Sequence, residues 1–91
     1  MKFSVLTTVY KKEIPRNLRK SLISSYQQTV KPTEIILVCD GELTEELDRE
    51  IEKLQRAIPI LKVFHLAENL GSGPASLFGV NQCQTEFIAR M

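Results

Sequence analysis

The sequence has no apolar run long enough to cross a membrane. Its longest runs, such as Ile35–Cys39, fall far short of the roughly 20 apolar residues that a spanning helix needs. The first residues, Met1–Phe3, enter a strand pattern directly and do not form the charged and apolar regions of a signal peptide. We therefore expect no membrane segment in this chain and a cytoplasmic location, either free or at the inner face of the membrane.

The chain is also poor in metal-binding residue types and in charge of one sign. Cys39 and Cys83 lack the paired spacing of a zinc site, so both are expected to be reduced thiols in the core. His65 is the only histidine and has no second candidate ligand at metal spacing. Twelve basic residues balance eleven acidic residues without a block of like charge, which argues against nucleic acid or another polyanion as a partner.

Three common enzyme motifs are missing. The glycines do not form the Gly-x-Gly-x-x-Gly fingerprint of dinucleotide-binding proteins, and no Gly-Lys-Ser/Thr of a phosphate-binding loop occurs. The serines and acids fall on separate expected elements, so no Ser-His-Asp arrangement can be assembled.

What the sequence has is a regular alternation of strand-like and helical segments. Apolar, β-branched runs predict strands at residues 3–10, 34–40, 60–66 and 85–91, and stripes at helical spacing predict helices at 15–28, 45–58 and 74–83. Pro15 suits the first turn of its helix, and Thr44 is a candidate N-cap. This order predicts a three-layer α/β/α fold with a mostly parallel sheet. Because the chain ends within the fourth expected strand, we expect residues 1–91 to be part of a larger domain.

Candidate ligand-binding residues lie where the expected strands end. In parallel sheets, ligands bind outside the carboxyl ends of the strands, near the point where strand order reverses. Asp40 could accept hydrogen bonds from a pyrimidine N–H or from ribose hydroxyls, or it could be an ordinary turn aspartate. Tyr10 could lay its ring against a base, or it could be an ordinary aromatic at a strand end. Residues 69–73 could present backbone N–H groups to an anion at a helix start, or could serve tight helix–strand packing.

Four segments, taken in order, resemble the opening of glycosyltransferase family 2. The segments are residues 3–10 (FSVLTTVY), 24–41 (SSYQQTVKPTEIILVCDG), 68–71 (ENLG) and 86–91 (EFIARM). This family has the A-type fold and includes many bacterial cell-surface polysaccharide enzymes. The resemblance covers nearly the whole chain and lies in the order and spacing of the segments.

The resemblance implies a Rossmann-like nucleotide-diphospho-sugar transferase fold and a set of nucleotide-binding residues. In the family, the second strand ends in two acids before a glycine, and the second acid binds the base. Asp40 takes that position, while Cys39 replaces the first acid. The residues that the resemblance places at the nucleotide are Thr8, Tyr10, Asp40, Asn69, Gly71 and Arg90, the last near the phosphates.

The resemblance also implies what lies beyond the chain. The carboxylates of the family's Asp-x-Asp-like motif, which hold Mg²⁺ or Mn²⁺, are expected just after Met91, and no catalytic residue is assigned within residues 1–91. The expected full-length enzyme transfers a sugar from a nucleotide-diphosphate donor to a hydroxyl of a saccharide or lipid-linked saccharide, with inversion. Residues 1–91 are then its nucleotide-binding portion, inactive alone.

Two other functional classes remain open, together with one assembly. A nucleotidyltransferase would normally have a glycine-rich basic loop after its first strand, and residues 10–15 lack those glycines. A non-catalytic α/β regulatory or interaction domain would use Asp40 only as a turn residue. An exposed edge on the last strand would favour a homodimer.

Overall fold

The computed structural model describes residues 2–90 as four strands alternating with three helices. The elements are β1 (Phe3–Val9), α1 (Pro15–Gln27), β2 (Glu34–Cys39), α2 (Glu45–Ala57), β3 (Leu61–His65), α3 (Ser72–Gln82) and β4 (Phe87–Arg90). Every expected element is present, with ends that shift by one or two residues. The largest shift at a helix start is in α3, which begins at Ser72 and contains Pro74 in its first turn. The end of the last expected strand, Met91, lies outside the described residues.

The four strands form one parallel sheet in the order β3-β2-β1-β4. The chain moves outward from β1 to β3 and then crosses back to place β4 on the other side of β1, so strand order reverses beside β1. Val9 pairs with Cys39, and Cys39 pairs with His65, so β1, β2 and β3 end level with one another. The three strands therefore present one common carboxyl edge next to the point of reversal, which is where open α/β sheets bind ligands.

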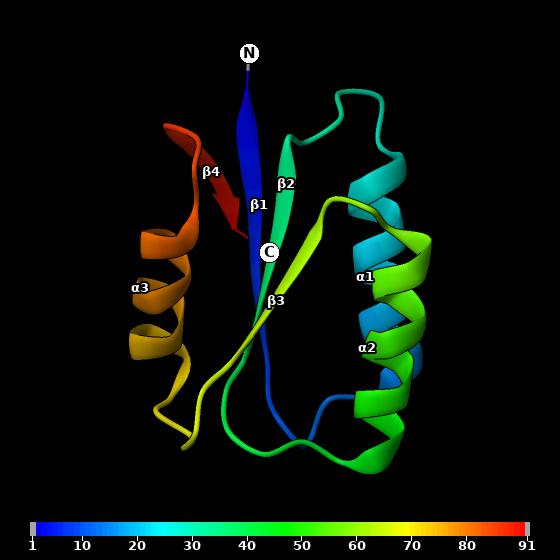
Figure 1. The fold of residues 1–91 in the computed structure, drawn as a ribbon, viewed down its shortest axis with the longest axis vertical. Coiled ribbons are helices and arrows are strands. Elements are labelled where there is room, and N and C mark those ends of the chain that lie inside the picture. The colour runs from blue at the N-terminus through cyan, green and yellow to red at the C-terminus, as the bar shows by residue number, and fades with distance from the viewer. Residues whose placement is uncertain (1, 91) are drawn as a thin grey trace.

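Helices cover both faces of the sheet, which confirms the expected three-layer α/β/α fold. Figure 1 shows α1 and α2 side by side on one face and α3 alone on the other. Alternate residues of each strand face opposite layers, so Val5 and Leu37 pack toward α1 and α2, whereas Leu6 and Val38 pack toward α3. Within residues 2–90, no helix has the length and apolar character needed to cross a membrane.

The local signals that predicted α2 act as expected. The Thr44 side chain accepts a hydrogen bond of 3.2 Å from the backbone N–H of Leu47, which caps the helix. Leu47, Ile51 and Leu54 are buried and form the stripe that faces the sheet. The helix is thus fixed against β2 and β3, and the turn that precedes it is held at the carboxyl edge.

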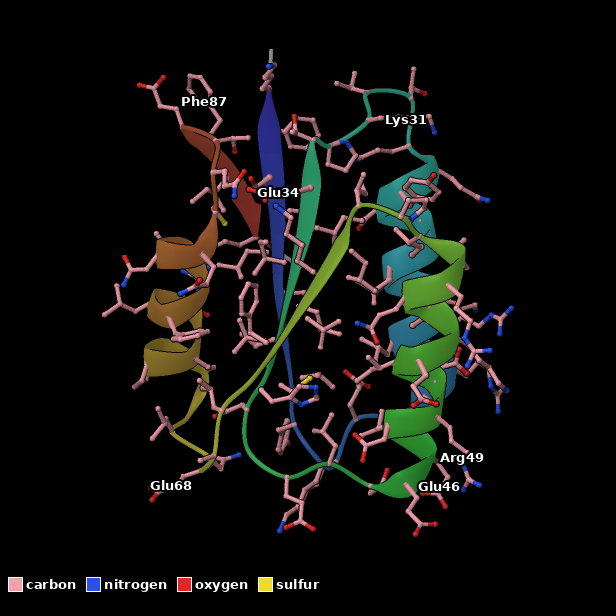
Figure 2. The ribbon with its side chains drawn as sticks, in the orientation of Figure 1. Lys31, Glu34, Glu46, Arg49, Glu68 and Phe87 are labelled. Atoms are coloured by element: carbon pink, nitrogen blue, oxygen red, sulfur yellow. The ribbon has the colours of Figure 1, made fainter. Side chains whose placement is uncertain are left out.

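A buried carboxylate, not foreseen from the sequence, anchors the opposite edge of the sheet. Glu34 accepts hydrogen bonds from the Ser4 hydroxyl and the Gln84 backbone N–H, both at 2.6 Å, and from the Lys62 ammonium at 2.8 Å. Burial acts to raise the pKa of Glu34, but these hydrogen bonds and the positive charge of Lys62 together hold the pKa below its ordinary value. Figure 2 shows Glu34 at one end of the sheet and Glu68 at the other, beside the segment that leads into α3.

Candidate functional site

Five of the six predicted site residues come together around one hollow at the carboxyl edge. The hollow has a volume of about 320 Å³, and its lining residues are Thr8, Val9, Tyr10, Asp40, Asn69, Gly71 and Ser72. They come from the end of β1, the end of β2 and the loop between β3 and α3. Residues separated by up to 64 positions in the sequence therefore form one surface.

Two residues at the end of β1 offer polar or aromatic groups to the hollow, Thr8 and Tyr10. Thr8 follows Leu6 by two positions, so it shares the face of the sheet that packs toward α3. Tyr10 comes directly after the strand and is 48% exposed. One face of the hollow thus offers a hydroxyl and an aromatic ring that is open to a ligand.

Asp40 lies at the hollow and also binds the opposite wall. Its Oδ1 accepts a hydrogen bond of 2.7 Å from the backbone N–H of Leu70, and its Oδ2 accepts one of 3.1 Å from Gly71. The residue is only 5% exposed. Asp40 therefore binds the loop that leads into α3, and its place in the lining would let it contact a ligand as well.

Further hydrogen bonds join the end of β2 to the loop after β3. The backbone N–H of Leu66 donates to the Cys39 carbonyl at 2.9 Å, and the Asn69 side-chain amide donates to the Asp40 carbonyl at 3.2 Å. Gly41 has a φ of +86°, and a Cβ at this position would lie 2.8 Å from the backbone nitrogen of Asn69. Only glycine fits this close approach without strain.

The glycine-containing turn at residues 69–73 is engaged by the protein itself. The backbone N–H groups of Leu70 and Gly71 both donate to Asp40, just before α3 begins at Ser72. A carboxylate at this place complements the positive end of the helix dipole. For these two amides the structure supports tight packing of the loop, not the binding of an external anion.

Arg90 is the one predicted residue that does not line the hollow. It ends β4 and pairs with Leu6, two residues before Thr8 on the neighbouring strand. Because Leu6 and Thr8 face α3, Arg90 points to the same side of the sheet. Arg90 therefore lies on the strand next to β1, across the point where strand order reverses, and on the face of the sheet that carries Thr8.

Cys39, which takes the position of the family's first acid, faces away from the hollow. It is fully buried among residues that pack against α1 and α2. Burial, with a smaller contribution from the negative charge of Asp48, raises the pKa of the Cys39 thiol to about 12. Both cysteines are free thiols, as expected, and Cys39 is a neutral core residue.

Sequence reasoning did not single out Lys11 or Ser72. Ser72 lines the hollow described above, and Lys11 lines an adjoining hollow of about 470 Å³ that also includes Asp40 and Asn69. Lys11 directly follows the expected strand at residues 3–10, and Ser72 lies within residues 69–73, so their position at the carboxyl edge was the signal that could have found them. Among residues 2–90, no group of three or more His, Cys, Asp or Glu side chains is placed to hold a metal ion.

Comparison with known proteins gives matches to glycosyltransferases. Residues 4–91 match the family model described as Glycosyl transferase family 2. The Escherichia coli UDP-Gal:alpha-D-GlcNAc-diphosphoundecaprenol beta-1,3-galactosyltransferase is 43% identical over 89 residues, and the Erwinia amylovora amylovoran biosynthesis glycosyltransferase AmsE is 39% identical over 89 residues. Each match covers 98% of this chain but only 32% and 33% of these relatives, so the chain spans about one third of their length.

A solved structure extends the likeness to three dimensions. The crystal structure of S. aureus TarS 1-349 in complex with UDP is similar over 100% of this chain and 27% of that chain, with a TM-score of 0.76 and 27% sequence identity. The arrangement of strands and helices is therefore shared with a protein that has been seen with a nucleotide bound.

Proposed function

Because the chain belongs to glycosyl transferase family 2, we propose that the hollow at its carboxyl edge binds the nucleotide part of a nucleotide-diphosphate sugar. The observation that carries the proposal is the meeting of Thr8, Tyr10 and Asp40 at the edge where strand order reverses. The similarity to a UDP-bound structure supports UDP as the nucleotide.

The base and ribose lie at Asp40 in this proposal. Each carboxylate oxygen accepts one backbone hydrogen bond and retains a second acceptor site, which suits the N–H of a pyrimidine or a ribose hydroxyl. The exposed ring of Tyr10 supplies a surface on which the base stacks. Asn69 and Gly71 form the wall that faces these two residues.

The diphosphate points away from the start of α3. A carboxylate already sits at that helix end, so a second anion would be repelled there. Arg90 lies on the same face of the sheet across the point of strand reversal and carries a positive charge. The nucleotide is therefore proposed to run from Asp40 toward β4.

The reaction proposed for the full protein is transfer of the sugar to a hydroxyl acceptor, with inversion, in bacterial polysaccharide or glycoconjugate synthesis. The names of the E. coli and Erwinia relatives support a saccharide or lipid-linked saccharide as acceptor. A lipid-linked acceptor would place the enzyme at the cytoplasmic face of the membrane. Among residues 2–90, no group of side chains fits the Mg²⁺ or Mn²⁺ that the family resemblance implies.

Two further proposals concern residues 1–91 as a separate polypeptide. This polypeptide is proposed to bind the nucleotide without turning over a sugar donor. The described residues include neither a metal site nor a residue assigned as the general base for the acceptor hydroxyl. The same polypeptide is also proposed to form a homodimer, because β4 lies at an edge of the sheet and exposes Phe87.

Titration of UDP and GDP into the full protein, followed by calorimetry, tests the proposed function. We expect saturable UDP binding that Asp40→Ala abolishes and that Glu46→Ala leaves unchanged. Glu46 is a matched control, because it is an exposed acid on α2 and lies outside the hollow (Figure 2). A regulatory or interaction domain would show no saturable binding to either nucleotide, and that result would refute the proposal.

A further inference from the structure

We infer that Asp40 has a second role at the nucleotide site, as a positioning residue whose carboxylate holds residues 66–72 in place as one wall of the hollow. The inference rests on the proposed function, since it concerns the same hollow. It adds to the direct contact of Asp40 with the base and ribose: part of the effect of Asp40 on nucleotide binding passes through the backbone of residues 66–72.

The three oxygens of Asp40 all bind this segment, while its backbone N–H donates to the Val9 carbonyl at 2.8 Å. Both carboxylate oxygens accept backbone N–H groups, from Leu70 at 2.7 Å and from Gly71 at 3.1 Å, and its carbonyl accepts the Asn69 side-chain amide at 3.2 Å. The three oxygens of Asp40 thus bind one residue each, and these are three consecutive residues of one loop. Two of those residues, Asn69 and Gly71, line the hollow.

The backbone conformations of Gly41 and Gly71 allow this contact. Gly41, directly after Asp40, adopts a φ of +86° and lies so close to Asn69 that a Cβ would meet its backbone nitrogen at 2.8 Å. Gly71 adopts a φ of +95°, which turns the chain from the loop into α3. L side chains rarely adopt either conformation, so both glycines are required where Asp40 binds the loop.

The two oxygens of the Asp40 carboxylate explain how this side chain holds the loop. The two N–H groups donate to different oxygens of the Asp40 carboxylate, so a side chain with an acceptor oxygen at each position binds both in this geometry. In Asp40→Asn, an NH₂ group would replace one oxygen and would face a backbone N–H instead of accepting from it. The substitution keeps the size of the side chain and removes one hydrogen bond and the charge.

Backbone hydrogen exchange in the full protein without nucleotide tests the inference directly. Hydrogen bonds to a charged group are the stronger kind, so we expect the amides of residues 66–72 to exchange about tenfold faster or more in Asp40→Asn than in the wild type. The exchange of α2 should stay the same. A side chain that only contacted the ligand would leave exchange unchanged while nucleotide affinity fell, and that outcome would overturn the inference.

A pair of glycine variants tests the loop while Asp40 stays intact. A Cβ at Gly71 or at Gly73 would meet no atom within 4 Å, but only Gly71 has a positive φ. We expect Gly71→Ala to speed the exchange of residues 66–72 in the nucleotide-free protein and to weaken UDP binding, and Gly73→Ala to do neither. Equal exchange in the two variants would count against the inference even if Asp40→Asn failed to fold.

The two proposals can fail separately. If the wild type binds no nucleotide, the proposed function is wrong, yet the exchange measurements still decide whether Asp40 holds the loop. If UDP binds but Asp40→Asn and Gly71→Ala leave exchange as in the wild type, Asp40 is a direct contact and the inference is wrong.

Discussion

The buried Glu34 carboxylate of β2 forms an ion pair of 2.8 Å with the Lys62 ammonium of β3. The Glu34 side chain is 3% exposed, whereas the Lys62 side chain is 43% exposed and reaches solvent. Oε2 of Glu34 also accepts hydrogen bonds from the Ser4 hydroxyl of β1 and from the backbone N–H of Gln84, just before β4. One carboxylate therefore connects all four strands at the edge opposite the hollow.

Replacing Glu34 by alanine should destabilise the protein. The change leaves the backbone N–H of Gln84 and the Ser4 hydroxyl without their buried acceptor, at a cost of about 1 to 3 kcal/mol. Urea unfolding of the full protein measures the free energy of unfolding. Glu52→Ala is the matched control, because Glu52 makes only an exposed pair with Arg56, at 4.0 Å, and such pairs contribute little. Equal losses in the two variants would contradict the role assigned to Glu34.

The stability of the protein should also depend on pH through Glu34. Its pKa in the folded state lies below the ordinary value of 4.5, so the folded state releases this proton more readily than the unfolded state. The resulting stabilisation is present in full above pH 4.5 and is lost as pH falls through the lower folded pKa. Urea unfolding at a series of pH values should show a steeper fall for the wild type than for Glu34→Gln. Parallel curves would show that Glu34 does not contribute.

Local sequence signals predicted the fold well because each element carries its own pattern. The apolar run of β2, the cap at Thr44 and the stripe through Leu47 act within a few residues, and all three appear as expected. The carboxylate contacts could not be predicted in this way. Glu34 binds Gln84 across 50 positions, and Asp40 binds Leu70 across 30. In the sequence, both acids look like ordinary residues that flank a strand.

The candidate site was likewise predicted only in part: its location was expected, but its backbone contacts were not. The rule for parallel sheets predicted the edge, and the family resemblance predicted which residues face a nucleotide, so Thr8, Tyr10 and Asp40 were named together. Neither source indicated that the amides of Leu70 and Gly71 are bound by Asp40. Their direction depends on the positive φ of Gly71 and on the close approach of Gly41 to Asn69, which only the folded chain defines.

The ring of Tyr10 should contribute more to nucleotide binding than its hydroxyl. In the proposed site the base stacks on the ring, and aromatic stacking of a base is worth about 1 to 3 kcal/mol. Tyr10→Ala should therefore weaken UDP binding by about one order of magnitude or more, whereas Tyr10→Phe should bind nearly as the wild type. Calorimetric titration of both variants measures the difference. A large loss in Tyr10→Phe would indicate that the hydroxyl carries the contact.

Residues 1–91, purified as a separate polypeptide, should bind UDP without turning over UDP-sugars. The reason is that the described residues hold no metal site. None of them is assigned as the general base for the acceptor hydroxyl. Release of UDP from UDP-galactose and UDP-glucose in the presence of Mn²⁺ gives the measurement, with the full protein as the positive control. Turnover by the isolated polypeptide at a rate near that of the full protein would refute this prediction.

The same polypeptide should self-associate through β4. This strand forms an edge of the sheet, and Phe87 at its start is 53% exposed. Sedimentation at increasing concentration should show a dimer, and Phe87→Lys should shift it toward monomer because a charged edge resists strand pairing. A wild-type polypeptide that remains monomeric at high concentration would exclude the dimer.

Two carboxylates, one at each end of β2, hold the chain on both sides of α3. Glu34 and Asp40 lie at opposite ends of β2 on the face that α3 covers, and they bind the chain just after and just before that helix. The six steps between them span about 20 Å of strand. The 11 residues of α3 span about 16 Å, which leaves one short connection at each end. Inserting or deleting a residue in α3 would turn one end away from its carboxylate, so this helix should tolerate substitutions on its outer surface far better than any change in its length.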